Sequence, residues 1–514
     1  MKIIFENIKN KSKELVRPIL PKFFESHQTG FDRQMLGYYS NSSLGEGMYD
    51  VITSTPNTNY DGCLELLKEN CVCGWVPYIK GKTKLVIYNF FGINYSIRRN
   101  VLVRISICNR VGVISARIIS LPPGQTHVED FSANFNLDKL EDAHLAVVEI
   151  YHPRISTNHG GHNGNLRFWG AYTDNQGQYS ATIHSAPLAF NAGIHKKFIL
   201  FMSFSTSEKV QNSHHFSLVK KTELLGEKIG SPPGLVIKQK KWFDGFNAIT
   251  DDEGGITGVW HNARHEHRQS YPLQQVASKL VKLTEQAFWI PPIKNILIII
   301  FIDPYETQIL HQEIQIDFFR NSEHLLTLNK SLNNSNCFNV DPHEFGGLKE
   351  EGVICVVKFT EEDASLFAYA HIGFKVGESQ SDVVHMHISP VTNILNNKIQ
   401  TVANGKSCLK FMHFPILKDE SCCSWIMVWN KDIHHGDNQF SLRIINSKGR
   451  ENIFYLQFSK KEIIKVVNLN ELVDKDSDNH YIAQIESVCA NYDATLLTHN
   501  KNTDHIAVDH LTGG

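Results

Sequence analysis

The sequence contains no long apolar run. A helix that crosses a bilayer needs roughly 20 apolar residues, whereas the most apolar stretch here, Ile296–Ile302, stops at Asp303-Pro304 and predicts a buried strand. The N-terminus also lacks the continuous apolar segment of a signal peptide, because apolar and charged residues alternate as far as Lys22. We therefore expect no membrane span and a cytoplasmic location.

Neither sign of charge is in excess. The chain of 514 residues carries 51 Lys and Arg against 53 Asp and Glu, a formal net charge of −2. Binding to duplex nucleic acid or to an anionic membrane surface depends on an excess of positive charge. The balance argues against nucleic acid as a partner.

Clustered cysteines are scarce. The ten cysteines are scattered, except for Cys71-x-Cys73 and the adjacent pair Cys422-Cys423. Neighbouring cysteines seldom bridge each other because the geometry strains the backbone, so reduced thiols are expected. A zinc site on Cys71 and Cys73 would need further ligands, and Cys63 is the only cysteine close by in the sequence.

Motifs of common catalytic mechanisms are missing. The sequence has no Gly-x-Ser-x-Gly elbow, no Gly-x-x-x-x-Gly-Lys-Ser/Thr phosphate loop and no Gly-x-Gly-x-x-Gly after a strand. This absence favours a non-catalytic protein over an enzyme.

What the sequence does contain is a regular alternation of strands and turns. Val101–Cys108 alternates apolar residues with Arg104 and Ser106, which is the period of a half-buried strand. Turn signals such as Asn109–Gly112 and Pro122–Gly124 recur along the chain. Short strands at this spacing are typical of antiparallel sandwiches and barrels, so we expect a mainly β fold of antiparallel β-sandwich units.

The same order of features occurs three times. A strand that ends in an Asn-x-x-Gly turn, Ile105–Gly112, has a counterpart in Leu442–Gly449, and Glu313–Phe319 takes the corresponding place between them. Internal repetition of this kind sets the architecture. The later core strands repeat as well, at Leu145–Tyr151, Val353–Phe359 and Tyr481–Val488.

A chain of this length is too long for one hydrophobic core. Helical spacing predicts a helix over Glu6–Phe24, then a polar loop over Ser40–Gly62, and a second helix over Val276–Phe288. The expected segments are a short helical N-terminal segment at 1–79, sandwich units at 80–195, 293–395 and 405–514, and a partly helical linker or inserted subdomain at 196–292.

Each predicted unit closes on a histidine beside a small-residue turn. His184 and His510 take this place in the first and third units, and His385 and His387 in the second. Two residues apart on a strand, His385 and His387 share a face and could hold one divalent metal ion. The interpretation we prefer is an imidazole that bonds a backbone carbonyl at a corner, because three identical catalytic sites in one chain would be unusual.

A second histidine cluster lies in the insert, where His261, His265 and His267 follow one another closely. On a helix, His261 and His265 would lie one turn apart, as a metal pair requires. The glutamate that a zinc peptidase carries beside the first histidine is replaced by Asn262. A solvated loop is therefore the preferred interpretation, with metal binding as the alternative.

A glycine-, asparagine- and histidine-rich loop, Asn158–Asn165, is the third candidate site. Aromatic residues follow it, and long loops of this composition often carry function. Sugar binding would use their rings as stacking platforms, whereas aromatic residues in strands more often pack in a core. The residues expected to bind a glycan are His159, His162, Asn163, Trp169 and Tyr172.

These observations favour a non-catalytic binding or assembly protein that presents loops from tandem sandwiches, with a glycan or a protein as its partner and no certain cofactor. The alternative is a metal-dependent enzyme, a hydrolase or an oxygenase, which uses the strand-end histidines and a divalent metal. A third reading is a homo-oligomer in which sheet edges of different copies pair.

Overall fold

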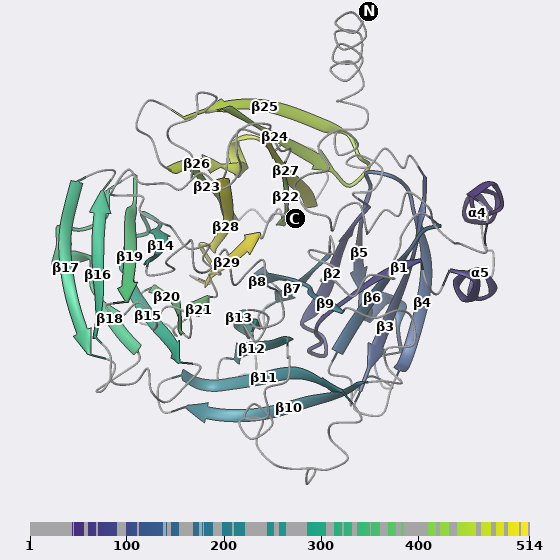
Figure 1. The fold of residues 1–514 in the computed structure, drawn as a ribbon, viewed down its shortest axis with the longest axis horizontal. Coiled ribbons are helices and arrows are strands. Elements are labelled where there is room, and N and C mark those ends of the chain that lie inside the picture. Colours follow the sequence, from purple (N-terminus) through teal and green to yellow (C-terminus); the bar gives the residue numbers. More distant parts are fainter. Residues whose placement is uncertain are drawn as a thin grey trace, which may run out of the picture.

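The computed structural model shows a mainly β protein, as the sequence predicts (Figure 1). Its described strands form seven antiparallel sheets. The structure describes residues 44, 46–55, 60–67, 70–89, 99–109, 113–136, 140, 145–153, 168–173, 177, 179–188, 198–207, 210–220, 244–250, 256–263, 285–304, 313–320, 323–331, 337–349, 351–359, 368–376, 382–384, 410–417, 422–430, 439–458, 464–473, 480–487, 492–502 and 505–511.

Three units of eight strands share one topology. In each unit the fourth, third, sixth and first strands form one sheet, here called the 4-3-6-1 sheet, and the fifth, second, seventh and eighth form the 5-2-7-8 sheet. The two sheets of a unit stack on a shared apolar core, which makes each unit an antiparallel sandwich. The predicted fold class is confirmed.

The strands of the three units fall in the following order. The first unit has β1 (Cys71–Pro77), β2 (Thr83–Tyr88), β3 (Val101–Cys108), β4 (Val113–Leu121), β5 (Thr126–Asp130), β6 (Leu145–Tyr151), β7 (Phe168–Thr173) and β8 (Tyr179–His184), and β9 (Ala186–Leu188) adds to its 4-3-6-1 sheet. The second has β14 (Glu285–Ile290), β15 (Ile296–Pro304), β16 (Glu313–Arg320), β17 (Glu323–Ser331), β18 (Cys337–Val340), β19 (Val353–Phe359), β20 (Ala368–Val376) and β21 (Asp382–Val384). The third has β22 (Lys410–Leu417), β23 (Cys422–Asn430), β24 (Gln439–Asn446), β25 (Glu451–Gln457), β26 (Ile464–Asn468), β27 (His480–Ser487), β28 (Tyr492–Asn500) and β29 (His505–Leu511).

The repetition extends to a short helical turn after the fifth strand of every unit. The turns are α7 (Phe131–Asn134), η5 (Pro342–Phe345) and η7 (Leu469–Glu471). In each, the preceding Asx side chain accepts a hydrogen bond from the backbone N–H two residues later, which satisfies an otherwise unpaired donor. These capping residues are Asp130, Asp341 and Asn468.

The insert between the first two units contains a sheet of its own. Strands β10 (Phe198–Ser207), β11 (Val210–Lys220), β12 (Asp244–Thr250) and β13 (Ile256–Ala263) pair consecutively. The helix predicted over Val276–Phe288 is wrong for its last residues, because β14 pairs there with β19, whereas 276–284 lie outside the described residues. Phe288, Trp289 and Ile290 are all buried, and such an apolar run suits a fully covered strand as well as a helix.

Two short helices precede the first strand. The loop predicted over Ser40–Gly62 instead contains α4 (Glu46–Ser54), and α5 (Asp61–Leu66) follows. The hydroxyl of Tyr49 lies 2.9 Å from the carbonyl oxygen of Tyr151 and accepts a hydrogen bond from the Leu102 N–H at 3.0 Å. The helices are thus fixed to the strands β3 and β6. The helix predicted over Glu6–Phe24 lies outside the described residues.

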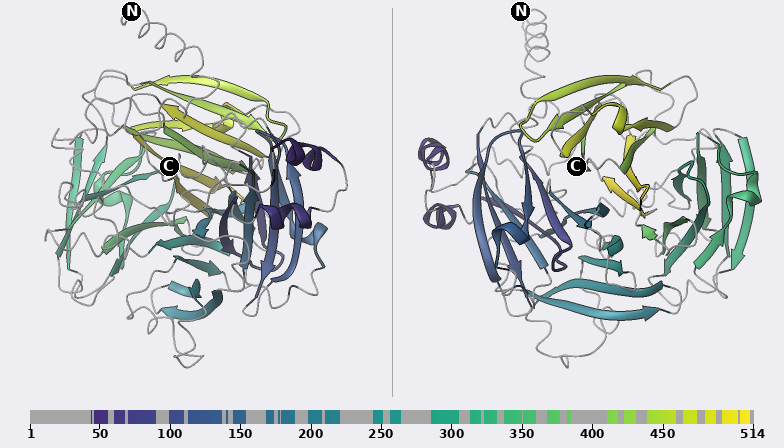
Figure 2. Two further views of the ribbon diagram at one scale, coloured as in Figure 1. Left: turned by 45° about the vertical axis from the view of Figure 1, so that its right-hand side comes forward. Right: turned by 180° about the vertical axis from the view of Figure 1, so that it is seen from behind.

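Four sheets meet in the middle of the molecule. Strand β8 lies beside β29 and β13, and β21 lies beside the same two strands, so the last strands of the three 5-2-7-8 sheets and of the insert form a closed circle of neighbours. Figure 1 shows the sheets spreading outward from this centre, and Figure 2 shows the same arrangement from behind.

The third unit packs against both others. The backbone N–H of Thr126, at the corner between β4 and β5, donates to the Ser447 carbonyl in the β24–β25 turn at 3.3 Å. Buried side chains of the third unit also belong to the core clusters of its neighbours, Ile445 and Ile482 to the first and Met427, Leu497 and Ile506 to the second. The third unit, at the end of the chain, is therefore packed against the first unit as well as against the second.

Two glycines offer a test of the packing within the second unit. Gly346 and Gly352 both have positive φ, 81° and 70°, but only Gly352 is crowded, because an added Cβ would meet the Ile290 carbonyl oxygen and the Trp289 indole nitrogen. We expect Gly352→Ala to lower the free energy of unfolding by about 3 kcal/mol, from the left-handed backbone and the overpacking together. Gly346→Ala, with open space around it, should cost about 1 kcal/mol. Urea denaturation of both variants checks this, and equal losses would contradict it.

Candidate functional site

Three of the candidate histidines, from the closing turns and from the insert, lie on strands that the fold brings together. His184 ends β8, His261 lies on β13 and His510 lies on β29, and these strands are neighbours at the centre. The fourth central strand, β21, ends at Val384, directly before His385. His385, His387 and His265 themselves lie outside the described residues.

The hairpin that ends the insert has the same register as the hairpin that ends the first unit. Both contain one irregularity, at Tyr172/Thr173 in β7–β8 and at Ile249/Thr250 in β12–β13. Counted from that point, the fourth pair is Trp169↔His184 in one hairpin and Phe246↔His261 in the other. Both pair a histidine with an aromatic residue.

His261 therefore occupies a closing position like that of His184. The solvated loop preferred from the sequence and the helix that would pair His261 with His265 are both wrong for His261, which lies on a strand. The His-x-x-x-His spacing indicates a metal pair only on a helix, and residues 256–263 form the strand β13 instead. Metal binding at these histidines stays a prediction. Within the described part of the chain, no group of three His, Cys, Asp or Glu side chains gathers as metal ligands would.

The aromatic residues of the predicted glycan site are core residues. Trp169 and Tyr172 are fully buried on β7, and the Tyr172 hydroxyl donates to the Pro77 carbonyl oxygen at 2.9 Å. Their burial supports packing, the alternative that the sequence also offered. His159, His162 and Asn163 lie outside the described residues, so their role stays a prediction.

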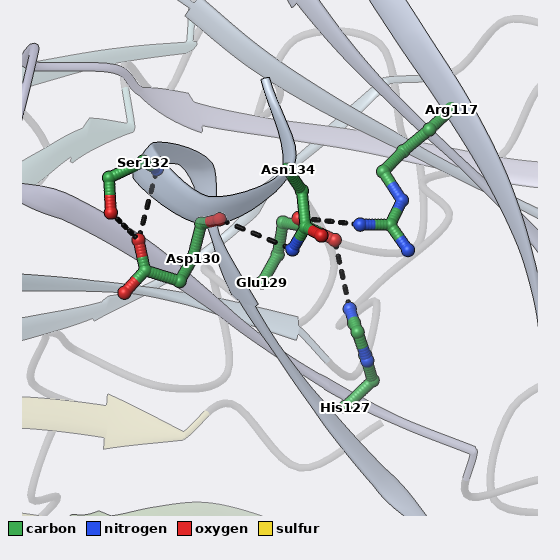
Figure 3. Close-up of polar contacts among 6 residues, drawn as sticks. All are labelled: Arg117, His127, Glu129, Asp130, Ser132 and Asn134. Carbon is green, nitrogen blue, oxygen red and sulfur yellow. Dashed lines mark hydrogen bonds and ion pairs between the residues drawn. The ribbon is translucent and has the colours of Figure 1, made fainter. Parts of the chain in front are cut away.

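The first unit also contains a buried ionic cluster that its sequence does not predict, shown in Figure 3. The carboxylate of Glu129, on β5, has no exposed surface. One of its oxygens lies 3.2 Å from Nη1 of Arg117, on β4, and the other lies 2.9 Å from Nε2 of His127. Arg117 pairs with the core residue Ile105 and so lies on the core face of β4. The cluster joins the two sheets of the sandwich along one side.

The other two units carry apolar side chains in this region. Their fourth and fifth strands pack against the core with Leu326, Leu328, Phe338 and Val340 in the second unit and with Phe454, Leu456 and Val467 in the third. A buried acid between the fourth and fifth strands is thus a specific departure of the first unit from the repeated pattern. The spacing His127-x-Glu129 is the only signal in the sequence. It indicates an ionic cluster only when Arg117, on β4, is known to lie beside β5.

The geometry excludes a serine–histidine–acid relay at this cluster. Asp130, next to Glu129, points to the opposite face of β5 and accepts hydrogen bonds from the Ser132 hydroxyl and backbone N–H (Figure 3). The Ser132 hydroxyl bond, foremost, lowers the pKa of the Asp130 carboxyl. Ser132 therefore bonds to Asp130, whereas His127 bonds to Glu129. Each carboxylate accepts hydrogen bonds that hold the local structure.

A second buried carboxylate, Asp317 on β16, is also fully paired. Nζ of Lys358 lies 2.6 Å from it, and Thr327 and Gln315 donate further hydrogen bonds. Burial acts to raise the pKa of this carboxyl, but the three donors outweigh burial, so the pKa is lowered. Asp317 stays ionised and ties β16 to β17 and β19.

Comparisons with known proteins give no family. No protein-family model matches the chain, and no curated protein matches it. One solved structure with some similarity is described as a tetra-tandem repeat in the extending region of a large adhesion protein. It is 10% identical, the alignment covers 81% of this chain and 91% of that chain, and the TM-score is 0.08. A TM-score of this size shows no shared fold and carries no argument. Among the described residues, no helix is long and apolar enough to cross a membrane.

The ionic cluster generates a stability prediction. Glu129→Gln leaves Arg117 without its buried counter-charge, and we expect a loss of about 3 kcal/mol in the local stability of the first unit. Native-state hydrogen exchange of the β4 and β5 amides measures this loss.

The matched control is the double variant Arg117→Leu with Glu129→Val, which copies the apolar packing of the second unit. Replacing a buried ion pair with apolar residues of similar volume is often neutral, so the double variant should recover most of the loss. A double variant no more stable than Glu129→Gln would show that the cluster does more than join the sheets.

Proposed function

We propose that the protein is a non-catalytic binding or assembly protein, in which a closed circle of sandwiches holds loops and sheet edges in fixed relative positions. One observation carries the proposal: Ile445 and Ile482 of the third unit are fully buried within the core cluster of the first. Core packing between units, rather than flexible linkage, is what a rigid platform requires.

The same contact has a close backbone approach. Gly449, in the β24–β25 turn, lies so near Gly124 that an added Cβ would stand 3.1 Å from the Gly124 carbonyl oxygen. Glycine at position 449 lets the two turns approach each other, and the Thr126–Ser447 hydrogen bond fixes their alignment. Loops held by such a frame bind with little ordering cost, because they are positioned in advance. A protein or a glycan remains the proposed partner, and the cytoplasm the proposed location.

Disrupting the contact between the first and third units tests the proposal. Ile445→Asp places a charge in the contact between the first and third units, whereas Lys448→Glu changes an exposed residue of the adjacent turn and serves as the control. Native mass spectrometry of the untagged chain should show complexes heavier than the 58.4 kDa chain. These should be lost in Ile445→Asp and kept in Lys448→Glu. Single chains in all three samples would contradict the proposal.

One observation favours a second candidate, the metal-dependent enzyme: β8, β13 and β29, the strands that carry His184, His261 and His510, are neighbours at the centre of the molecule. Elemental analysis of protein purified without a histidine tag tests this candidate. We expect a stoichiometric transition metal if it is right, and its loss in the combined variant His261→Ala, His385→Ala and His387→Ala. His343→Ala, at an exposed position, is the control. Metal-free protein would remove the candidate.

A further inference from the structure

Each 4-3-6-1 sheet ends, on the perimeter of the molecule, in the fourth strand of its unit. These fourth strands are β4, β17 and β25, and in the described part of the chain no further strand pairs beyond them. Figure 1 shows β17 and β25 on the outer rim, far from the central strands. An unpaired edge is a template for pairing with another chain unless the sequence prevents it.

Strand β25 exposes apolar side chains on its outward face. Tyr455 is 82% exposed and Ile453 is 37% exposed, and both belong to the few large apolar side chains left on the described surface. Phe454 and Leu456 alternate with them and pack on the third core, so the strand keeps a regular two-residue period. Its outward face is therefore an apolar stripe on a regular edge.

The three edge strands differ in the charged residues that could prevent pairing with a strand of another chain. Strand β4 carries Arg117 at its centre, and β17 carries Lys330 and Glu323. Charged residues on an edge discourage pairing, lysine above all. The only charged residue of β25 is Glu451, which is bonded to Arg443 of its own sheet at 2.9 Å. Arg117 of β4 is likewise bonded to Glu129, so what sets β25 apart is its pair of exposed apolar side chains, Ile453 and Tyr455.

We propose that β25 pairs antiparallel with β25 of a second copy of this chain. The proposal rests on the assembly function above and names the partner. Only one register pairs all seven residues of the strand, with Phe454 opposite Phe454 of the second copy. It places Ile453 opposite Tyr455 and Glu451 opposite Gln457, an aromatic–aliphatic pair and a hydrogen-bonding pair, each occurring twice.

The same operation fails on the other two edges. It would set Arg117 of β4 opposite Arg117 of the second copy, and it would bring no exposed apolar pair together on β17, whose exposed residues are Glu323, His324 and Asn329. Like charges directly opposite each other destabilise a strand pair. For β25 the pairing is self-complementary and closes after two copies, which is the condition for a twofold dimer. The two 4-3-6-1 sheets then continue as one sheet of eight strands.

Charge exchange on β25 tests the proposal. The double variant Ile453→Lys with Tyr455→Lys sets lysine opposite lysine between copies, and Ile453→Glu with Tyr455→Glu does the same with glutamate. Both positions are at the surface, so the fold should survive, and a thermal melt verifies this. By light scattering after size exclusion, we expect the parent chain to form a dimer at micromolar concentrations and each double variant to stay a monomer.

An equimolar mixture of the two double variants should recover the dimer, because lysine then faces glutamate across the junction. Asn329→Lys, an exposed change on β17, should leave the parent dimer intact. A dimer that persists in both double variants would overturn the β25 junction and leave the assembly function standing. A mixture that stays monomeric would also overturn it, as would a monomeric parent chain.

Discussion

The structure depends on the burial of apolar side chains between sandwich units, above all Ile445 and Ile482 of the third unit in the core cluster of the first. Each unit has a core of its own, but a sheet with two apolar faces cannot leave one of them in water without a large free-energy cost. Sheets of the third unit pack inward on their own core and outward on a neighbour. The packing between units, added to the packing within each unit, joins the three repeats into a single folded structure.

Much of the fold could be predicted because a half-buried strand alternates apolar and polar residues, and this two-residue period is visible in the sequence. The alternation in Val101–Cys108 gave β3, and its recurrence at Leu442–Gly449 identified the third strand of the last unit. The stretch Val276–Phe288 could not be treated this way, since its apolar residues fit a helix as well as a covered strand. Glu285–Ile290 forms the first strand of the second unit through its pairing with β19. Periodicity decides between the two only where one face meets water.

Less of the candidate site could be predicted, because its parts meet only through topology. The histidines at the ends of the units were found as a repeated feature, and His261 shares their place because β12–β13 copies the register of β7–β8. The Glu129 cluster could not be found from residue spacing, since Arg117 belongs to the opposite sheet. In sequence, Arg117, His127 and Glu129 look like ordinary surface residues of two edge strands.

The contact between β28 and β8 has a consequence for folding during synthesis. The Asn500 side chain reaches the Tyr179 carbonyl oxygen, a partner 321 residues earlier in the chain. Contacts that distant form late, because the intervening chain must first be made and ordered. Until the last strands leave the ribosome, the apolar patch of the first unit that receives Ile445 and Ile482 stays uncovered. The early repeats are thus in the state in which nascent multidomain chains are most prone to aggregate.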